Sequence, residues 1–143
     1  MSPHERKLAE NEVTLLKVLK GPTIIRYYES FTQNETIYIV MECAEGGSLS
    51  DRVTEKKAIG DPIPNQQVLD WTAQLVMGIM LMHSKNILHR DIKTQNMFLT
   101  KNDIVKLGDF GISKALGTQS DFAKTYCGTP YFMSPEVCRG EVY

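Results

Sequence analysis

Three polar side chains in the second half of the chain have the types and the spacing that suit chemistry on a phosphate group. Asp91 and Asn96 lie five residues apart in one predicted loop, and Asp109 follows a short apolar stretch. A carboxylate such as that of Asp91 can accept a hydrogen bond from a substrate hydroxyl. The oxygens of Asn96 and Asp109 are ligands of the kind that Mg²⁺ prefers. Together these groups suit phosphoryl transfer, which needs positioned metal ions, an oriented hydroxyl and charge neutralisation.

Taken one at a time, these residues have simpler explanations. Asp91 and Asp109 can be turn or capping carboxylates, and Asn96 can be a loop-capping amide. Their occurrence within three ordered strings favours chemistry, and the strings are His89 to Asn96, Asp109-Phe110-Gly111, and Gly128-Thr129-Pro130 followed by Ser134-Pro135-Glu136. For His89 and Phe110 we predict core packing rather than chemistry.

The first 44 residues are predicted to form a helix and an antiparallel hairpin. Ser2-Pro3-His4-Glu5 is typical of a capping box with proline at the first helical position, and it predicts a helix over residues 3–19. Gly21-Pro22 ends this helix. Residues 24–31 and 36–41 are predicted strands, joined by a turn at residues 33–35.

The remaining residues are predicted to be mostly helical around a second hairpin. Residues 45–48 contain two glycines and predict a flexible break between two parts of the chain. A short helix over residues 49–57 follows, and then a long helix, capped by Asn65, that runs to about His83. The predicted buried face of the long helix consists of Val68, Trp71, Leu75, Ile79 and Met82. Residues 97–99 and 104–107 are predicted short strands.

Composition narrows the class of protein. The chain has 143 residues, 42% of them hydrophobic, and a net charge of -1, which gives no indication of binding to nucleic acid or an anionic membrane. No apolar run is long enough to span a bilayer. Cys43, Cys127 and Cys138 lack metal-site spacing, so we expect free thiols in a reducing compartment, the cytoplasm.

The motifs resemble those of eukaryotic protein kinases, and within these the NIMA-related (Nek) serine/threonine kinases. The resemblance depends on residues 89–96 (HRDIKTQN), 107–114 (LGDFGISK) and 128–136 (GTPYFMSPE), with support from residues 37–42 (IYIVME) and 45–47 (EGG). It implies an α+β, two-lobe kinase fold, truncated here at both ends. Residues 1–44 would be part of the N-terminal lobe with the hinge, and residues 45–143 part of the C-terminal lobe.

The resemblance also implies a role for each motif residue. Asp91 would be the catalytic base, and Asn96 and Asp109 would hold Mg²⁺. Lys93 would stabilise the transferring phosphate and indicates serine/threonine specificity. Thr129 would brace both Asp91 and Lys93.

The ATP-binding residues implied by the resemblance lie in the first half of the chain. Glu42, Cys43 and Ala44 match the adenine-binding hinge, in which the backbone groups of Glu42 and Ala44 would meet the base. Met41 matches the gatekeeper, a position that is also compatible with plain core packing.

Glu12 stands out without the resemblance, because it lies at helical spacing from the apolar residues Leu8, Leu15, Leu16 and Leu19. A buried carboxylate needs a partner. In the family, this glutamate pairs with a lysine that holds the ATP phosphates. The alternative is a glutamate at the edge of the apolar stripe that reaches solvent.

Thr125 matches the activating phosphorylation site of the family, and Arg90 and Lys114 match the basic residues that receive its phosphate. Ser113, Thr118 and Ser120 are weaker candidates for phosphorylation.

The chain departs from the family pattern at both ends. The family's glycine-rich loop and Val-Ala-Ile-Lys strand do not precede Glu12, and few residues follow Glu136. We therefore expect a fragment, inactive alone, of a kinase that uses ATP and Mg²⁺ on the Ser or Thr hydroxyls of protein substrates. The alternative is a truncated kinase-like protein that only binds partners. The resemblance suggests a location in the cytoplasm, at the centrosome, in the cilium or in the nucleus.

Ser48 replaces an acidic residue common in the family, which puts a preference for basic substrates in doubt.

Overall fold

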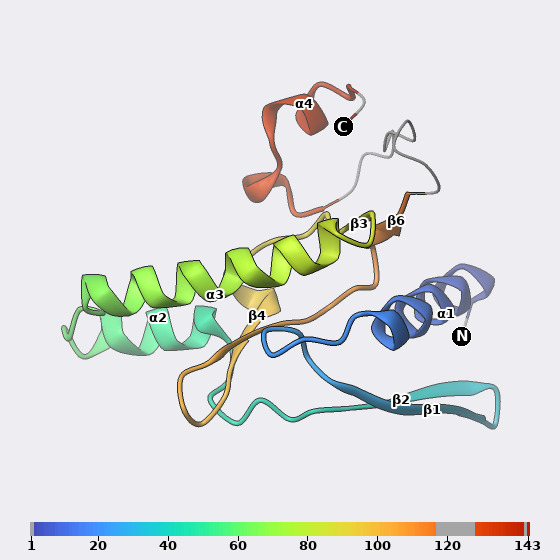
Figure 1. Cartoon of the computed structure of the whole chain (residues 1–143), viewed down its shortest axis with the longest axis horizontal. Helices are drawn as coiled ribbons and strands as arrows, with labels where there is room; N and C mark the ends of the chain where they lie inside the picture. The colour runs from blue at the N-terminus through green and yellow to red at the C-terminus, as the bar shows by residue number, and fades with distance from the viewer. Residues whose placement is uncertain (1, 117–127, 142) are drawn as a thin grey trace.

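The computed structural model describes residues 2–116, 128–141 and 143. The chain begins with a helix, α1 (Pro3–Val18), which packs on an antiparallel hairpin of β1 (Tyr27–Gln33) and β2 (Thr36–Met41) (Figure 1). Ser2 Oγ accepts the Glu5 N–H at 3.3 Å, and the Glu5 carboxylate accepts the Ser2 N–H at 2.7 Å. The predicted capping box is therefore confirmed.

The first hairpin differs from its prediction at the start. Asn34 and Glu35 form the turn with φ of 48° and 60°, the pair of positive values that a tight two-residue hairpin turn needs. β1 begins at Tyr27 because the residues before it pair elsewhere. The Leu107 N–H donates to the Thr23 carbonyl at 2.8 Å, and the Ile25 N–H donates to the Leu107 carbonyl at 2.9 Å.

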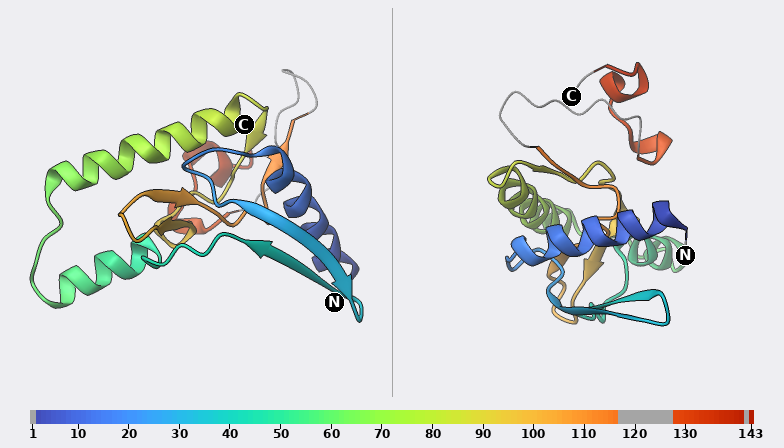
Figure 2. Two further views of the ribbon diagram at one scale, coloured as in Figure 1. Left: turned by 60° about the horizontal axis from the view of Figure 1, so that its bottom comes forward. Right: turned by 90° about the vertical axis from the view of Figure 1, so that its right-hand side faces the viewer.

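Two antiparallel helices, α2 (Leu49–Ala58) and α3 (Asn65–His83), lie away from α1 and the first hairpin (Figure 2). In α3 the residues Trp71, Gly78 and Met82 are buried. Val68 is 46% exposed, so its predicted burial is wrong: it lies in the first turn of α3, away from the core. The prediction that Asn65 caps α3 is also wrong, because Pro64 occupies the N-cap and Asn65 is the first helical residue.

A second hairpin, β4 (Met97–Leu99) and β5 (Val105–Leu107), lies between these two halves. Thr23–Ile25 run along β5, and residues 46–48 run along β4. Its two strands are therefore covered on both edges by segments far away in the sequence. The remaining elements are short: β3 (Ile87–Leu88), η1 (Thr94–Asn96), β6 (Lys114–Ala115), η2 (Pro130–Phe132) and α4 (Pro135–Cys138). β3 pairs with β6.

One hydrophobic core joins these elements. The C-terminal end of α1 supplies Leu15, Leu16 and Leu19, and α3 supplies Trp71 and Met82. The second hairpin and its neighbours add Ile24, Ile87, Met97, Leu99, Val105, Leu107 and Phe110. The predicted α+β class is confirmed, since helices and antiparallel strand pairs share this core. No helix among the described residues is both long and apolar enough to cross a membrane.

Gly46 is packed rather than flexible, so the predicted flexible break at residues 45–48 is wrong. The Gly46 N–H donates to the Leu99 carbonyl at 2.7 Å, and the Leu99 N–H donates to the Gly47 carbonyl at 2.8 Å. A Cβ atom at position 46 would lie 2.7 Å from the Leu99 oxygen and 2.8 Å from the Thr100 oxygen. Backbone oxygens cannot move aside as a flexible side chain can, so only glycine fits here.

Gly46→Ala is expected to lower the free energy of unfolding of residues 1–143 by about 1–3 kcal/mol, because the added methyl overpacks the junction. Urea unfolding followed by the fluorescence of Trp71, the single tryptophan, measures it. Gly111→Ala is the matched control, since its Cβ would meet only Asp109 Oδ1 at 3.5 Å. Equal midpoints for the two variants would contradict the packing argument.

Candidate active site

The register of the second hairpin brings the two predicted magnesium ligands to the same end of the sheet. Met97 pairs with Leu107, so Asn96, just before β4, lies beside Gly108, just after β5. The Gly108 N–H donates to the Asn96 backbone carbonyl at 3.0 Å. Asp109 follows directly, so the hairpin places its backbone next to Asn96 by simple antiparallel pairing.

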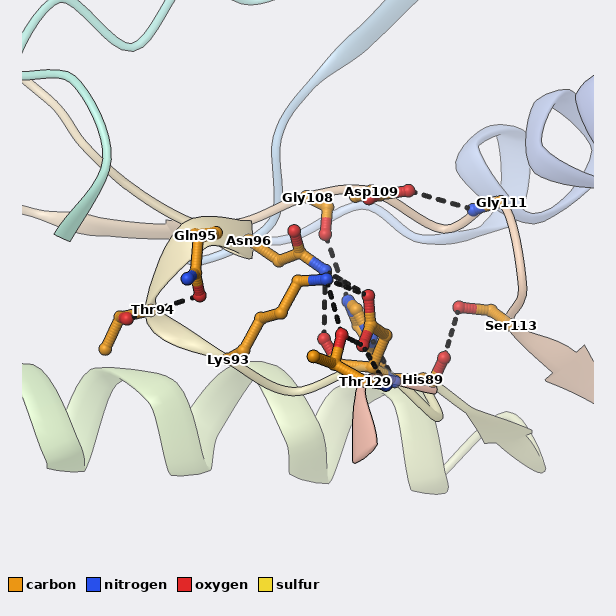
Figure 3. A network of polar contacts seen from close by, with 11 residues as sticks. His89, Lys93, Thr94, Gln95, Asn96, Gly108, Asp109, Gly111, Ser113 and Thr129 are labelled. Atoms are coloured by element: carbon orange, nitrogen blue, oxygen red, sulfur yellow. Dashed lines mark hydrogen bonds and ion pairs between the residues drawn. The ribbon is translucent and has the colours of Figure 1, made fainter. Parts of the chain in front are cut away.

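Asp91 is the centre of a hydrogen-bonded network. Figure 3 labels its partners Lys93, Asn96 and Thr129. Its Oδ1 accepts the Thr129 backbone N–H at 3.1 Å and the Thr129 hydroxyl at 2.7 Å. Its Oδ2 accepts the Asn96 amide at 3.0 Å and lies 2.7 Å from Lys93 Nζ. The Lys93 ammonium also donates to Thr129 Oγ1 at 2.7 Å. The structure thus brings together the four residues that the sequence analysis had grouped from separate motifs.

The network keeps Asp91 ionised at neutral pH. Burial on its own would raise the pKa of Asp91, but hydrogen bonds from Lys93, Thr129 and Asn96 outweigh it, and the pKa lies below the ordinary value. A carboxylate held in this way is fixed in orientation by four donors and keeps its negative charge toward any hydroxyl brought next to it.

His89 is a core residue, as predicted, and it supports the loop from beneath. It is 4% exposed, and its ring lies 5.3 Å from the Phe110 ring, centroid to centroid. Nδ1 accepts the Asp91 N–H at 3.3 Å, so Nε2 carries the proton donated to the Gly108 carbonyl at 3.0 Å. Burial lowers the pKa of His89, which keeps this neutral form. The ring therefore ties the Asp91 loop to the Asp109 segment.

Two residues of the site have positive φ angles, which residues other than glycine rarely adopt. Arg90 has a φ of 68° and Asp109 has a φ of 60°. Such conformations cost about 1–3 kcal/mol each and cluster at functional sites. At Asp109, Oδ1 accepts the Gly111 N–H at 3.4 Å while the side chain stays exposed. No sequence pattern indicated this strain.

The donor atoms fit a magnesium ion. The side-chain amide nitrogen of Asn96 donates to the Asp91 backbone carbonyl at 2.9 Å and to Asp91 Oδ2 at 3.0 Å. The side-chain carbonyl oxygen of Asn96 is therefore the atom left to bind a cation. Asp109 adds an exposed carboxylate, and both atoms are hard oxygens that Mg²⁺ prefers. The described residues contain no cluster of three or more His, Cys, Asp or Glu side chains that could hold a metal ion. Mg²⁺ in proteins is typically held by one or two carboxylates, with waters and substrate phosphates completing the shell.

A cavity of about 450 Å³ lies next to this site. It is lined by Glu12, Ile25, Met41, Glu42, Ala44, Phe98, Gly108, Asp109 and Phe110. The predicted hinge residues Glu42 and Ala44 and the gatekeeper Met41 thus share a cavity with Asp109. Cys43 is exposed and does not line it.

Glu42 is fixed by contacts that the sequence did not reveal. Its Oε2 accepts Lys106 Nζ at 3.0 Å and the Arg26 N–H at 3.1 Å, and its own N–H donates to the Arg26 carbonyl at 2.8 Å. Burial raises the pKa of Glu42, but Lys106 and the Arg26 N–H bring it below the ordinary value. Phe98, which lines the cavity, was also missed. The alternation of β4 could have indicated it, since Met97 and Leu99 are buried on the opposite face.

Glu12 is half-buried and faces the cavity. Its Oε1 accepts the Phe110 N–H at 3.4 Å, and among the described residues it forms no ion pair. Burial raises the pKa of Glu12, the Phe110 N–H partly offsets this, and the nearby Asp109 carboxylate adds to the rise. The Glu12 carboxylate is therefore directed toward Phe110, although the side chain keeps part of its exposure to solvent.

The residues expected to control phosphorylation are only partly described. Arg90 Nε donates to the Ile112 carbonyl at 2.6 Å, and Lys114 pairs with Leu88 across the β3–β6 ladder. Thr125, Thr118 and Ser120 lie outside the described residues. Ser113 is 3% exposed and its hydroxyl donates to the His89 carbonyl at 3.0 Å, which argues against it as a phosphate acceptor.

Comparison with known proteins agrees with this geometry. A family model described as a protein kinase domain matches residues 1–143. Serine/threonine-protein kinase Nek1 of Mus musculus is 45% identical over 143 residues, which are 100% of this chain and 12% of that protein. Nek4 of Mus musculus is 46% identical over 99% of this chain and 18% of its own length. Nek5 of Homo sapiens is 41% identical over 100% of this chain and 20% of its own length.

The chain therefore belongs to the protein kinase family. Its relatives at 41–46% identity place it among the NIMA-related (Nek) serine/threonine kinases, and the predicted resemblance is confirmed. The chain spans a fifth or less of the length of these three relatives.

Proposed function

We propose that this chain carries the catalytic residues of a serine/threonine protein kinase that transfers the γ-phosphate of ATP to protein hydroxyls. The network of Asp91, Lys93, Asn96 and Thr129 beside Asp109 carries the proposal, because it fixes a charged carboxylate next to a pair of magnesium-type oxygens. Residues 1–44 would belong to the N-terminal lobe and residues 45–143 to the C-terminal lobe. The substrates would be proteins in the cytoplasm.

Each side chain would have one task. Asp91 would accept the hydrogen bond of the substrate hydroxyl, hold it in line with the phosphate and take up its proton. Lys93, 2.7 Å from Asp91, would neutralise charge on the transferring group. Asn96 and Asp109 would hold Mg²⁺, which neutralises phosphate charge. Adenine would lie in the 450 Å³ cavity against the backbone of Glu42 and Ala44.

Acceptor choice tests this proposal. Residues 1–143 would replace the matching segment of the mouse Nek1 kinase domain, giving a chimeric kinase domain in which every residue discussed above comes from this chain. With labelled ATP and Mg²⁺, we expect label on Ser and Thr peptides and none on the matched Tyr peptide. Label on tyrosine alone would contradict the proposed specificity.

Residues 1–143 alone are expected to transfer no measurable phosphate. The β1–β2 hairpin is a two-stranded sheet of its own, which is marginal in water, and its last residue, Met41, lines the cavity proposed to hold ATP. Glu12 lacks an ion pair within the described residues. Thermal shift with MgATP and transfer to a serine peptide measure this. Magnesium-dependent transfer by residues 1–143 would contradict it, whereas capture of a protein partner without transfer would favour the interaction-protein alternative.

Thr125 is proposed as the activating phosphorylation site, since it lies between residues 109–111 and 134–136, with Arg90 and Lys114 as the groups that receive its phosphate. Thr125→Ala is expected to reduce the activity of the chimeric kinase domain several-fold, and Thr118→Ala is the matched control. Mass spectrometry of active enzyme should find phosphate on Thr125. Full activity of Thr125→Ala would rule this site out.

A further inference from the structure

We propose that Asn11 of α1 is a positioning residue for the loop of residues 89–96, which holds Asp91 and is called the catalytic loop below, and that it acts through Ser113. This inference depends on the proposed kinase function for its kinetic consequence, but not for its geometry. The Asn11 side-chain amide donates to the Ser113 carbonyl at 3.0 Å, across 102 residues of sequence. We call the two residues and this hydrogen bond the Asn11–Ser113 connection.

Ser113 is built into the structure on three sides. It is 3% exposed, and its N–H donates to the Phe110 carbonyl at 3.0 Å. Its hydroxyl donates to the His89 carbonyl at 3.0 Å, a contact that Figure 3 shows. Its own carbonyl receives the Asn11 amide. Ser113 therefore links α1, the Asp109-Phe110-Gly111 turn and the catalytic loop.

The links continue from His89 to the reacting group. His89 Nδ1 accepts the Asp91 N–H at 3.3 Å, and His89 Nε2 donates to the Gly108 carbonyl at 3.0 Å. A continuous chain of hydrogen bonds thus runs from the Asn11 amide to the backbone of Asp91. Because these groups are half-buried or buried, each broken bond leaves a partner without water to replace it.

The connection complements the Glu12 contact one residue along α1. Glu12 Oε1 accepts the Phe110 N–H at 3.4 Å, whereas the hydrogen bond from the Asn11 amide to the Ser113 carbonyl is shorter, at 3.0 Å. Two neighbouring residues of α1 thus contact the segment that follows Gly108, and the Asn11 amide makes the closer contact.

Asn11→Asp in the chimeric kinase domain tests the inference. The carboxylate has nearly the same shape as the amide, but it cannot donate and it repels the Ser113 carbonyl. We expect kcat to fall about tenfold, the factor that corresponds to about 1.4 kcal/mol, with KM for ATP and peptide nearly unchanged. Ser113→Ala should have a similar effect, and the double variant should lose less than the product of the two.

Asn102→Asp is the matched control, since Asn102 is exposed at the tip of the second hairpin. It adds the same charge and should leave kcat unchanged. Asn11→Gln keeps a donor and should restore part of the rate. If Asn11→Asp unfolds, Asn11→Ser removes the amide without adding charge and replaces it in the same assay. If kcat of the Asn11→Asp variant, or of Asn11→Ser in its place, equals that of Asn102→Asp, the inference is overturned.

Hydrogen exchange separates this inference from the proposed function. Without nucleotide, the Ser113 amide should exchange faster in Asn11→Asp than in wild type, and equally in Asn102→Asp and wild type. If the wild-type chimera transfers no phosphate, the kinase proposal fails and this exchange comparison alone decides the Asn11–Ser113 connection. Unchanged exchange at Ser113 in Asn11→Asp contradicts the connection whatever the activity.

Discussion

Asp91→Asn in the chimeric kinase domain is expected to reduce kcat by about 10²- to 10⁴-fold, the contribution usual for a general base. Asparagine keeps the size of the side chain, so the hydrogen bonds from the Thr129 N–H and hydroxyl can persist at Oδ1. It cannot take up a proton, however, and it removes the negative charge that faces Lys93 at 2.7 Å. The loss should therefore fall on kcat, with little effect on KM for ATP.

Steady-state transfer to a serine peptide measures this loss, and thermal unfolding checks that the variant is folded. Asp61→Asn is the control, because Asp61 is exposed and lies in the loop before α3. A folded Asp91→Asn variant with at least a tenth of the wild-type kcat would exclude Asp91 as the base.

Asp109→Asn should lower transfer by roughly 10²-fold or more, since a bound metal supplies several kcal/mol of charge stabilisation and about 1.4 kcal/mol corresponds to a factor of ten. Asparagine is the variant of choice because it tolerates the φ of 60° at this position, where alanine would be strained. The Gly111 N–H can still find an oxygen at position 109.

A magnesium titration of transfer distinguishes a metal role from a structural one. Asp109→Asn should need a much higher Mg²⁺ concentration for half-maximal rate, whereas Asp61→Asn should match wild type. Near-normal turnover at the wild-type Mg²⁺ requirement would show that Asp109 does not hold the metal.

Much of the architecture could be predicted because its signals are local. The capping box at Ser2 and the apolar spacing along α1 and α3 indicate helices directly. The strands predicted at residues 97–99 and 104–107 form the hairpin that brings Asn96 beside Gly108. The motif strings also grouped Asp91, Lys93, Asn96 and Thr129, which the structure brings into one network.

The rest depends on pairings between distant segments. The first strand was predicted to begin at Ile24, but the Ile25 N–H donates to the Leu107 carbonyl instead of to the hairpin. Gly46 was predicted to be flexible, but its N–H donates to the Leu99 carbonyl. Lys106 donates a hydrogen bond to Glu42, which is 64 residues away in the sequence, and Asn11 donates one to Ser113, which is 102 residues away. A single isolated polar residue carries no periodic signal, so contacts of this kind emerge only from the folded chain.

Phosphate transfer by the chimeric kinase domain, compared with its Asp91→Asn variant, is the most direct test of the proposed function. With labelled ATP, Mg²⁺ and a serine peptide, the account predicts transfer that disappears when Mg²⁺ is chelated and falls by about 10²-fold or more on Asp91→Asn. A folded chimera that binds MgATP but transfers equally little phosphate with Asp91 or Asn at position 91 would contradict it.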